Sequence, residues 1–534
     1  MDSTADFEPF ERRAREVEVA ARSIVSICRN DDFGRGWRPK GVDEVAILLE
    51  SLGYSSDIVA ELWYPDLFAL ARDVMALIDQ YVSDEERTAG RDVSWFVDAC
   101  RDYAIGSLYS GPWIIAVIGL AVFGASLWSS LSTPLYLATA IALGVYVAQL
   151  VSGFYSQAIA RRLTFYFLQE NQGLMRWTFE RFIALALGTT LVASLVLWVG
   201  LRAAYGNPDA WLAASFCAGS AIFQLSLVPL YTLRRFAWII AIATASTLVT
   251  GVTFVLLFHR HVDVPWEPAT LAVEIGAIGA LVLLTTYRWL ARGARNTSTD
   301  FVPPALRSIV SSTLPYAAFG FFYFGSILCD RIFAGIATAG GHGYAYSAVY
   351  ELGADVALLA MLPVTGVVNV ILEALPKRIL AGATVGIGAS GRMQAGMARF
   401  YALGVLAVLG STIAAVLLGE TVGALVVASP HLGGGNPDAL LVLRFSVVGY
   451  ALIMLGLLNA QLLFFLSRPL WPLIGSAAAC VVSIAWGSVA LLMHAAPGAM
   501  VGGLVCGALA FVIVTTIAAA SAMRRFTYTY YAAY

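Results

Sequence analysis

The sequence predicts an all-α membrane protein, with twelve transmembrane helices in two six-helix bundles and a small helical cytoplasmic domain before them. Hydrophobic residues make up 59% of the 534-residue chain and charged residues only 13%, well below the ~25% charged residues of a soluble protein. Twelve apolar stretches of about 19 to 29 residues follow one another between residues 111 and 523, and each can cross the hydrocarbon core as a helix. A basic, proline-containing segment separates the first six stretches from the last six.

The region before the first apolar stretch differs in charge from the rest of the chain. Residues 1–105 contain 12 Lys or Arg and 22 Asp or Glu, whereas the remainder contains 21 and 13. Apolar residues at helical spacing predict short helices at 7–28, 42–52, 56–62 and 67–82. We therefore expect residues 1–105 to form an acidic helical domain. Its acidity argues against binding to an anionic membrane surface.

The apolar stretches divide the remainder into two bundles. The first bundle covers residues 106–290, a cytoplasmic linker covers 291–313, and the second bundle with a short cytoplasmic tail covers 314–534. Because six is even, the halves should run in the same direction, as in transporters with parallel repeats and a site between the repeats. The predicted spans are 111–129, 134–158, 182–201, 211–231, 236–258 and 271–290, then 314–336, 344–372, 400–418, 439–466, 471–493 and 500–523.

A proline near the start of the first span in each half supports the duplication. Pro112 and Pro315 occupy these positions, and proline fits the first turn of a helix, where its missing N–H is not needed.

Basic residues predict how the helices are oriented. With the N-terminus inside, seventeen Lys or Arg residues fall in or beside the cytoplasmic loops and tail, and only Arg202 and Arg260 fall outside. Positive residues are enriched on the cytoplasmic side of membrane proteins, so both termini should be cytoplasmic. The first apolar stretch follows a charged segment, so we expect no cleavable signal peptide.

The sequence lacks the motifs of several enzyme classes. The chain has only two lysines, Lys40 and Lys377, and neither belongs to the Gly-Lys-Ser/Thr sequence that binds nucleotide phosphates. D-x-D and H-E-x-x-H sequences are absent as well, and the longest predicted outer loop, 419–438, has few reactive side chains. The six cysteines are far apart without C-x-x-C spacing, which argues against a disulfide framework or zinc site. We expect a non-enzyme without a cofactor or metal, and nothing indicates nucleic-acid binding.

Ionisable residues inside the predicted spans are the main site candidates, because charge is costly in a membrane and usually faces a cavity or a partner. Apart from Arg288 at a cytoplasmic end, the first six spans contain only Glu274. The second six contain Asp330, Arg331, Glu351, Asp355 and Arg444.

Glu351 and Asp355 are four residues apart and share one helix face. Two close carboxylates resist double ionisation unless an arginine or a bound cation compensates, which favours a coupling site for H+ or Na+. The alternative is a structural network in which Arg331 and Arg444 neutralise Asp330, Glu351 and Asp355.

The span 314–336 also carries a run of aromatic residues, of which Tyr316, Phe319 and Tyr323 are candidates for a sugar path because aromatic faces can stack on sugar rings. Packing between helices or contact with lipid is the alternative for most of this run. In the next span, Pro363 is expected to bend the helix, and Asn369 could satisfy the backbone groups that a bend frees.

Two segments resemble members of a known family. The stretch 102–113, Asp-Tyr-Ala-Ile-Gly-Ser-Leu-Tyr-Ser-Gly-Pro-Trp, resembles the start of the first membrane helix of the Pel exopolysaccharide transporters. The stretch 321–332, Phe-Phe-Tyr-Phe-Gly-Ser-Ile-Leu-Cys-Asp-Arg-Ile, is similar to the aromatic run ending in Asp-Arg of their seventh helix.

The resemblance implies the polysaccharide exporter branch of the multidrug/oligosaccharidyl-lipid/polysaccharide (MOP) superfamily, which works by alternating access without ATP. It further implies export of an N-acetylhexosamine polymer across the bacterial inner membrane, for biofilm matrix. The implied partners are a cytoplasmic glycosyltransferase and other inner-membrane biosynthesis subunits. The extension of about 100 residues departs from this family. We expect it to dock such a partner, with a purely stabilising role as the alternative.

Other functions stay open at this point. Within transporters, the alternatives are an ion-coupled flippase for lipid-linked oligosaccharides and a drug antiporter. A flippase should hold a lipid pyrophosphate with cations deep in its cavity, whereas Arg331 and Arg444 are predicted near the outer face. From another class, a membrane glycosyltransferase or an assembly scaffold is possible.

Overall fold

The structure is a computed structural model. It describes residues 16–21, 23–24, 39, 41–52, 54, 56–62, 64–88, 95–112, 114–115, 119, 135–169, 171–205, 210–259, 267–296, 304–340, 343–359, 361–383, 390–428 and 436–531. The chain forms two compact units. One comprises Met1–Arg101 with Ile371–Ala389, and the other comprises Asp102–Val370 with Ser390–Tyr534.

The smaller unit is built on short helices around an apolar core. Its helices α2 (Val42–Ser51), α3 (Ser56–Glu61) and α4 (Leu67–Thr88) lie at three of the predicted positions, and α4 runs on beyond residue 82. Buried apolar side chains at helical spacing form the core: Val45, Leu49, Leu70, Val74 and Ile78 are at most 1% exposed. Most of the predicted helix 7–28 lies outside the described residues.

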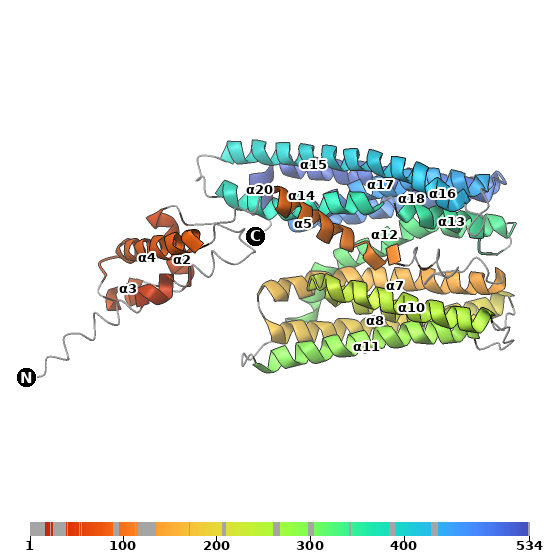
Figure 1. The fold of residues 1–534 in the computed structure, drawn as a ribbon, viewed down its shortest axis with the longest axis horizontal. Coiled ribbons are helices and arrows are strands. Elements are labelled where there is room, and N and C mark those ends of the chain that lie inside the picture. The colour runs from red at the N-terminus through yellow and green to blue at the C-terminus, as the bar shows by residue number, and fades with distance from the viewer. Residues whose placement is uncertain are drawn as a thin grey trace, which may run out of the picture. The chain divides into compact units, whose positions relative to one another are not determined.

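The N-terminal bundle belongs to the larger unit. After α5 (Trp95–Leu108) it contains α7 (Leu135–Leu168), α8 (Gln172–Tyr205), α9 (Ala210–Thr232), α10 (Phe236–His259) and α11 (Glu267–Asn296). Figure 1 shows α7, α8, α10 and α11 side by side, in yellow to green. The predicted span 111–129 falls largely outside the residues that the structure describes.

The C-terminal bundle holds the remaining helices, drawn in green to blue in Figure 1. They are α12 (Leu306–Thr338), α13 (Ala348–Leu358), α14 (Met361–Ala383), α15 (Ser390–Leu418), α16 (Ala424–Ala428), α17 (Pro437–Phe465), α18 (Leu470–Leu492), α19 (Val501–Arg524) and α20 (Phe526–Tyr531). A π-helical turn, Gly419–Gly423, joins α15 to α16, so helix continues into the segment predicted as an outer loop at 419–438.

Within the described ranges, ten helices are long and apolar enough to span a membrane, or eleven if α13 and α14 form one span bent by 41°. The prediction of an all-α polytopic membrane protein is confirmed. Helices run past the predicted spans where polar residues continue them. As a result, α11 and α12 extend into both ends of the stretch predicted as a linker, 291–313.

One local prediction is wrong in detail. Pro315 lies well inside α12, which begins at Leu306, so it does not occupy a first helical turn. The side-chain nitrogen of Asn369 donates to a backbone carbonyl of another helix, that of Asp102 in α5, at 2.7 Å.

The helices of the two bundles alternate in direction, which gives the bundles two distinct ends. We call the end where α7, α9, α13 and α17 begin the arginine-poor end, since the predicted outer loops lie there. The opposite end is the arginine-rich end.

Candidate functional site

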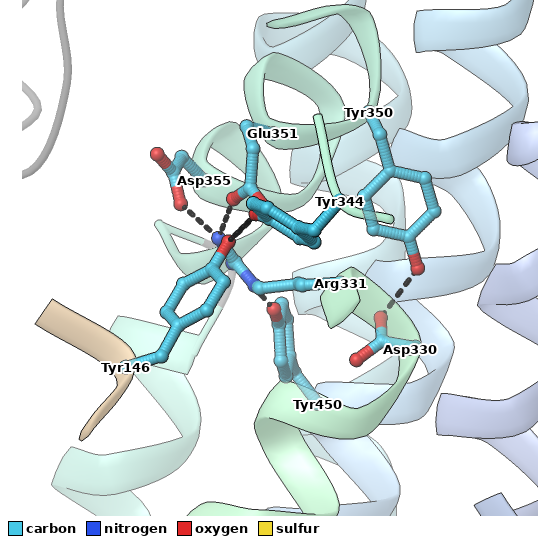
Figure 2. A network of polar contacts seen from close by, with 8 residues as sticks. All are labelled: Tyr146, Asp330, Arg331, Tyr344, Tyr350, Glu351, Asp355 and Tyr450. Atoms are coloured by element: carbon cyan, nitrogen blue, oxygen red, sulfur yellow. Dashed lines mark hydrogen bonds and ion pairs between the residues drawn. The ribbon is translucent and has the colours of Figure 1, made fainter. Parts of the chain in front are cut away.

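A buried guanidinium connects three helices of the C-terminal bundle near the arginine-poor end (Figure 2). Arg331 on α12 is 7% exposed. Its Nη1 donates to the carboxylate of Glu351 and, at 2.8 Å, to Oδ1 of Asp355, both on α13. Its Nη2 donates to the hydroxyl of Tyr450 on α17, at 2.9 Å. The predicted shared face of Glu351 and Asp355 is therefore the face that Arg331 contacts.

A tyrosine of the N-terminal bundle completes this network. The hydroxyl of Tyr146 on α7 donates to Oε1 of Glu351 at 2.5 Å, and the hydroxyl of Tyr344 donates to that of Tyr146 at 3.5 Å. Figure 2 shows Tyr146 approaching the carboxylates from its own helix, opposite Arg331. Glu351 thus contacts a cation of its own bundle and a hydroxyl of the other bundle.

Asp330 lies beside this network but has different partners. It is 1% exposed, and one carboxylate oxygen accepts a hydrogen bond from the hydroxyl of Tyr350. Its other oxygen, Oδ1, is buried without a hydrogen-bond partner. Asp330 and Arg331 are neighbours in sequence, but their side chains therefore contact different residues.

The acidic groups outnumber the basic group in this cluster. Glu351, Asp330 and Arg331 are buried, and Asp355 is partly buried. If all three acids were ionised, a single arginine would face three negative charges. An uncompensated buried charge is strongly unfavourable, so full ionisation of all three acids would be costly here. No group of three or more His, Cys, Asp or Glu side chains suited to a metal occurs among the described residues.

Two of the predicted charged candidates lie elsewhere. Arg444 is not part of the network: its side chain is 61% exposed and its Nε lies 3.1 Å from Oε2 of Glu420 in the π-helical turn. The structural-network alternative is therefore wrong for Arg444 only, because Arg331 does pair with Glu351 and Asp355 as that alternative expected. Glu274 lies on α11 of the N-terminal bundle, where it accepts a hydrogen bond from Thr253 at 2.8 Å, and its Oε2 is buried without a partner.

The aromatic candidates pack within the C-terminal bundle, where Tyr316 and Phe319 are buried and Tyr323 is partly buried. The Tyr316 ring also lies 5.0 Å from the guanidinium of Arg161 on α7. Phe319 and Tyr316 are 1% and 5% exposed and contact Phe464, with ring centroids 5.0 Å apart in each pair. Tyr323 stacks on Phe319 at 5.7 Å. The structure supports the packing alternative for these three residues, because the rings contact one another and neighbouring helices.

The sequence did not indicate the tyrosines of the site. Tyr146, Tyr344, Tyr350 and Tyr450 come from separate parts of the chain and converge on the charged residues. A buried tyrosine hydroxyl needs a hydrogen-bond partner, and this requirement was the only available signal.

We compared the chain with known protein families, sequences and structures. No protein-family model and no curated protein sequence matches the chain. Among solved structures, an outward-facing multidrug resistance MATE family transporter of the MOP superfamily matches with a TM-score of 0.52 and 15% sequence identity, over 80% of this chain and 97% of that chain. The chain shares the MATE transporter fold. A MATE structure in complex with MaD3S matches with a TM-score of 0.50 and 13% identity, over the same shares of the two chains.

At these identities the similarity is one of fold. It agrees with the expected all-α membrane fold. The Pel assignment and its cargo stay predictions.

Proposed function

We propose that this protein moves a solute across a membrane by alternating access between its two bundles. The observation that carries this proposal is the hydrogen bond from Tyr146 to Glu351. It joins the bundles through an ionisable group that also pairs with Arg331. The MATE fold supports a transport function in general.

The proposed coupling follows from the partners of Glu351. An ionised Glu351 holds both the Arg331 guanidinium and the Tyr146 hydroxyl. A proton or Na+ on the carboxylates competes with Arg331 and weakens the junction between the bundles. Because linkage between binding and conformation is reciprocal, opening of the arginine-poor end would in turn change the affinity for the cation.

We propose an exopolysaccharide as the cargo and a bacterial inner membrane as the location. The support is the resemblance of stretches 102–113 and 321–332 to the Pel transporters. A drug antiporter is equally compatible with the fold, and an ion-coupled oligosaccharide flippase is the third candidate.

Reconstitution separates these functions. Proteoliposomes with a labelled nucleotide sugar should make no polymer from this chain alone, whereas a glycosyltransferase would make it. With a cytoplasmic glycosyltransferase added, polymer should enter the lumen of inverted vesicles only when this chain is present. Gradient-driven movement of a cationic dye, without polymer export, would instead support the drug antiporter.

The acidic N-terminal region is proposed to dock the cytoplasmic glycosyltransferase or a companion subunit. Deleting residues 1–100 should then reduce polymer export several-fold and abolish co-purification of that partner. Thermal unfolding of the purified membrane part serves as the control and should change little. Normal export together with unchanged co-purification would leave only a stabilising role for this region.

A further inference from the structure

At one place the two bundles touch backbone to backbone. Gly153 on α7 and Gly320 on α12 face each other there. A Cβ atom on Gly320 would overlap the carbonyl oxygen of Gly153, and one on Gly153 would lie 3.1 Å from the carbonyl oxygen of Gly320 and overlap the ring of Phe324. No side chain other than hydrogen fits between these two helices.

A second glycine contact lies between α5 and α14. A Cβ atom on Gly106 would overlap Cβ of Asn369 and lie 3.0 Å from Cα of Gly366, and one on Gly366 would lie 2.6 Å from the ring of Tyr103. Hydrogen bonds flank this contact: the Asn369 side chain donates to the Asp102 carbonyl at 2.7 Å, and the hydroxyls of Ser110 and Thr365 are 3.3 Å apart.

The internal repeat relates these two contacts. Gly366 follows Gly153 by 213 residues, and Gly320 follows Gly106 by 214. Helices α7 and α13 begin at residues 135 and 348, and α8 and α15 end at residues 205 and 418, again 213 apart. The two contacts thus occupy corresponding positions in the two halves, with Gly106 in α5 just before the first predicted span and Gly320 in α12.

Polar contacts lie on both sides of the Gly153–Gly320 contact. Toward the arginine-poor end are the Tyr146–Glu351 hydrogen bond and the bond from the Tyr346 backbone to Thr139, at 3.0 Å. Toward the arginine-rich end, Nε of Arg162 donates to the Thr313 hydroxyl at 3.1 Å. At 1.5 Å per residue, Gly153 lies ~10 Å along α7 from Tyr146 and ~13 Å from Arg162.

We propose that these two glycine contacts are the fulcrum on which the bundles rock. This inference rests on the proposed transport function and assigns a positioning role to Gly106, Gly153, Gly320 and Gly366. The glycines let the two backbones approach closely, with the Phe324 ring and the Gln157 side chain beside the Gly153–Gly320 contact, so the helices can turn against each other while their separation stays fixed. Rocking about it opens one set of polar contacts while the other stays closed.

The test uses spin labels at both ends of the full-length chain. The pair Ala203 and Asp438 reports on the arginine-poor end, and the pair Trp238 and Leu470 on the arginine-rich end; all four side chains are exposed. A fulcrum requires these two distances to change in opposite directions when Tyr146→Phe removes the hydrogen bond that joins the bundles at Glu351. A change at one end only, or in the same direction at both, overturns the fulcrum even where no glycine variant folds.

Glycine variants provide a second test of the fulcrum. Gly320→Ala and Gly106→Ala should abolish the opposed distance change and reduce transport at least tenfold. Gly188→Ala and Gly410→Ala are matched controls, since nothing lies within 4 Å of an added Cβ at either position. Gly219→Ala clashes with Ala272 inside the N-terminal bundle, so it should lower stability and leave the opposed change intact.

Failure of this inference and failure of the proposed function give different results. Wild-type transport and distance changes in both Gly320→Ala and Gly106→Ala would overturn the fulcrum and leave transport standing. Opposed distance changes in a wild-type chain that moves no cargo would support the fulcrum and remove the transport function.

Discussion

Replacing Arg331 with alanine is expected to destabilise the protein more than any other single substitution at the site. Arg331 is 7% exposed and pairs with Glu351 and Asp355. Removing one partner of a buried ion pair leaves uncompensated charge and costs about 3–5 kcal/mol. We expect a large fall in the thermal unfolding temperature of the purified protein in detergent, or loss of monodisperse protein.

A compensated variant isolates the charge effect. Arg331→Met combined with Glu351→Gln and Asp355→Asn removes the cation and both paired acids, and should recover most of the lost stability. Arg444→Ala is the matched control: its pair with Glu420 is exposed, and exposed pairs contribute about 0–1 kcal/mol. Wild-type thermal stability of Arg331→Ala would contradict a buried charged network.

Glu351→Gln is expected to uncouple transport from its ion gradient. Glutamine can still accept the Tyr146 hydrogen bond but cannot take up a proton or contribute negative charge to a cation site. Arg331 keeps Asp355 as a partner at 2.8 Å, so the protein should remain folded. The initial rate of transport, measured with and without an imposed gradient, should fall about tenfold and become independent of the gradient.

Two further substitutions separate charge from hydrogen bonding. Asp355→Asn should also reduce gradient dependence, because it removes the second acid on the same face of α13. Tyr146→Phe keeps all the charges and removes the hydrogen bonds of the Tyr146 hydroxyl to Glu351 and Tyr344, so gradient dependence should persist at a changed rate. If Glu351→Gln and Asp355→Asn transported as fast as the wild type, with the same response to the gradient, the coupling role of the cluster would be lost.

The fold was predictable because the length of an apolar stretch reports directly on a transmembrane helix. Helix ends were less predictable, since polar pairs can extend a helix beyond its apolar part. Arg176 and Glu180, 2.8 Å apart, lie in such an extension, and α8 begins at Gln172 rather than at residue 182. The same limitation applies to residues 419–428, where the predicted loop is a π-helical turn followed by α16.

The charged centre of the site could be predicted only in part. Spacing placed Glu351 and Asp355 on one face, and the structure brings both to Arg331. The sequence did not reveal which way Arg444 points, because its partner Glu420 comes from a segment without apolar periodicity. The link through Tyr146 could not be predicted either, since its partner lies 205 residues away.

A reversible cross-link between the bundles tests the central claim most directly. The Tyr346 backbone nitrogen lies 3.0 Å from the Thr139 hydroxyl at the arginine-poor end, so Thr139→Cys with Tyr346→Cys, in a chain whose native cysteines are replaced, should form a disulfide on mild oxidation. If the bundles must separate there, transport by the oxidised protein should stop, and reduction should restore it. Undiminished transport by fully cross-linked protein would contradict alternating access through this end.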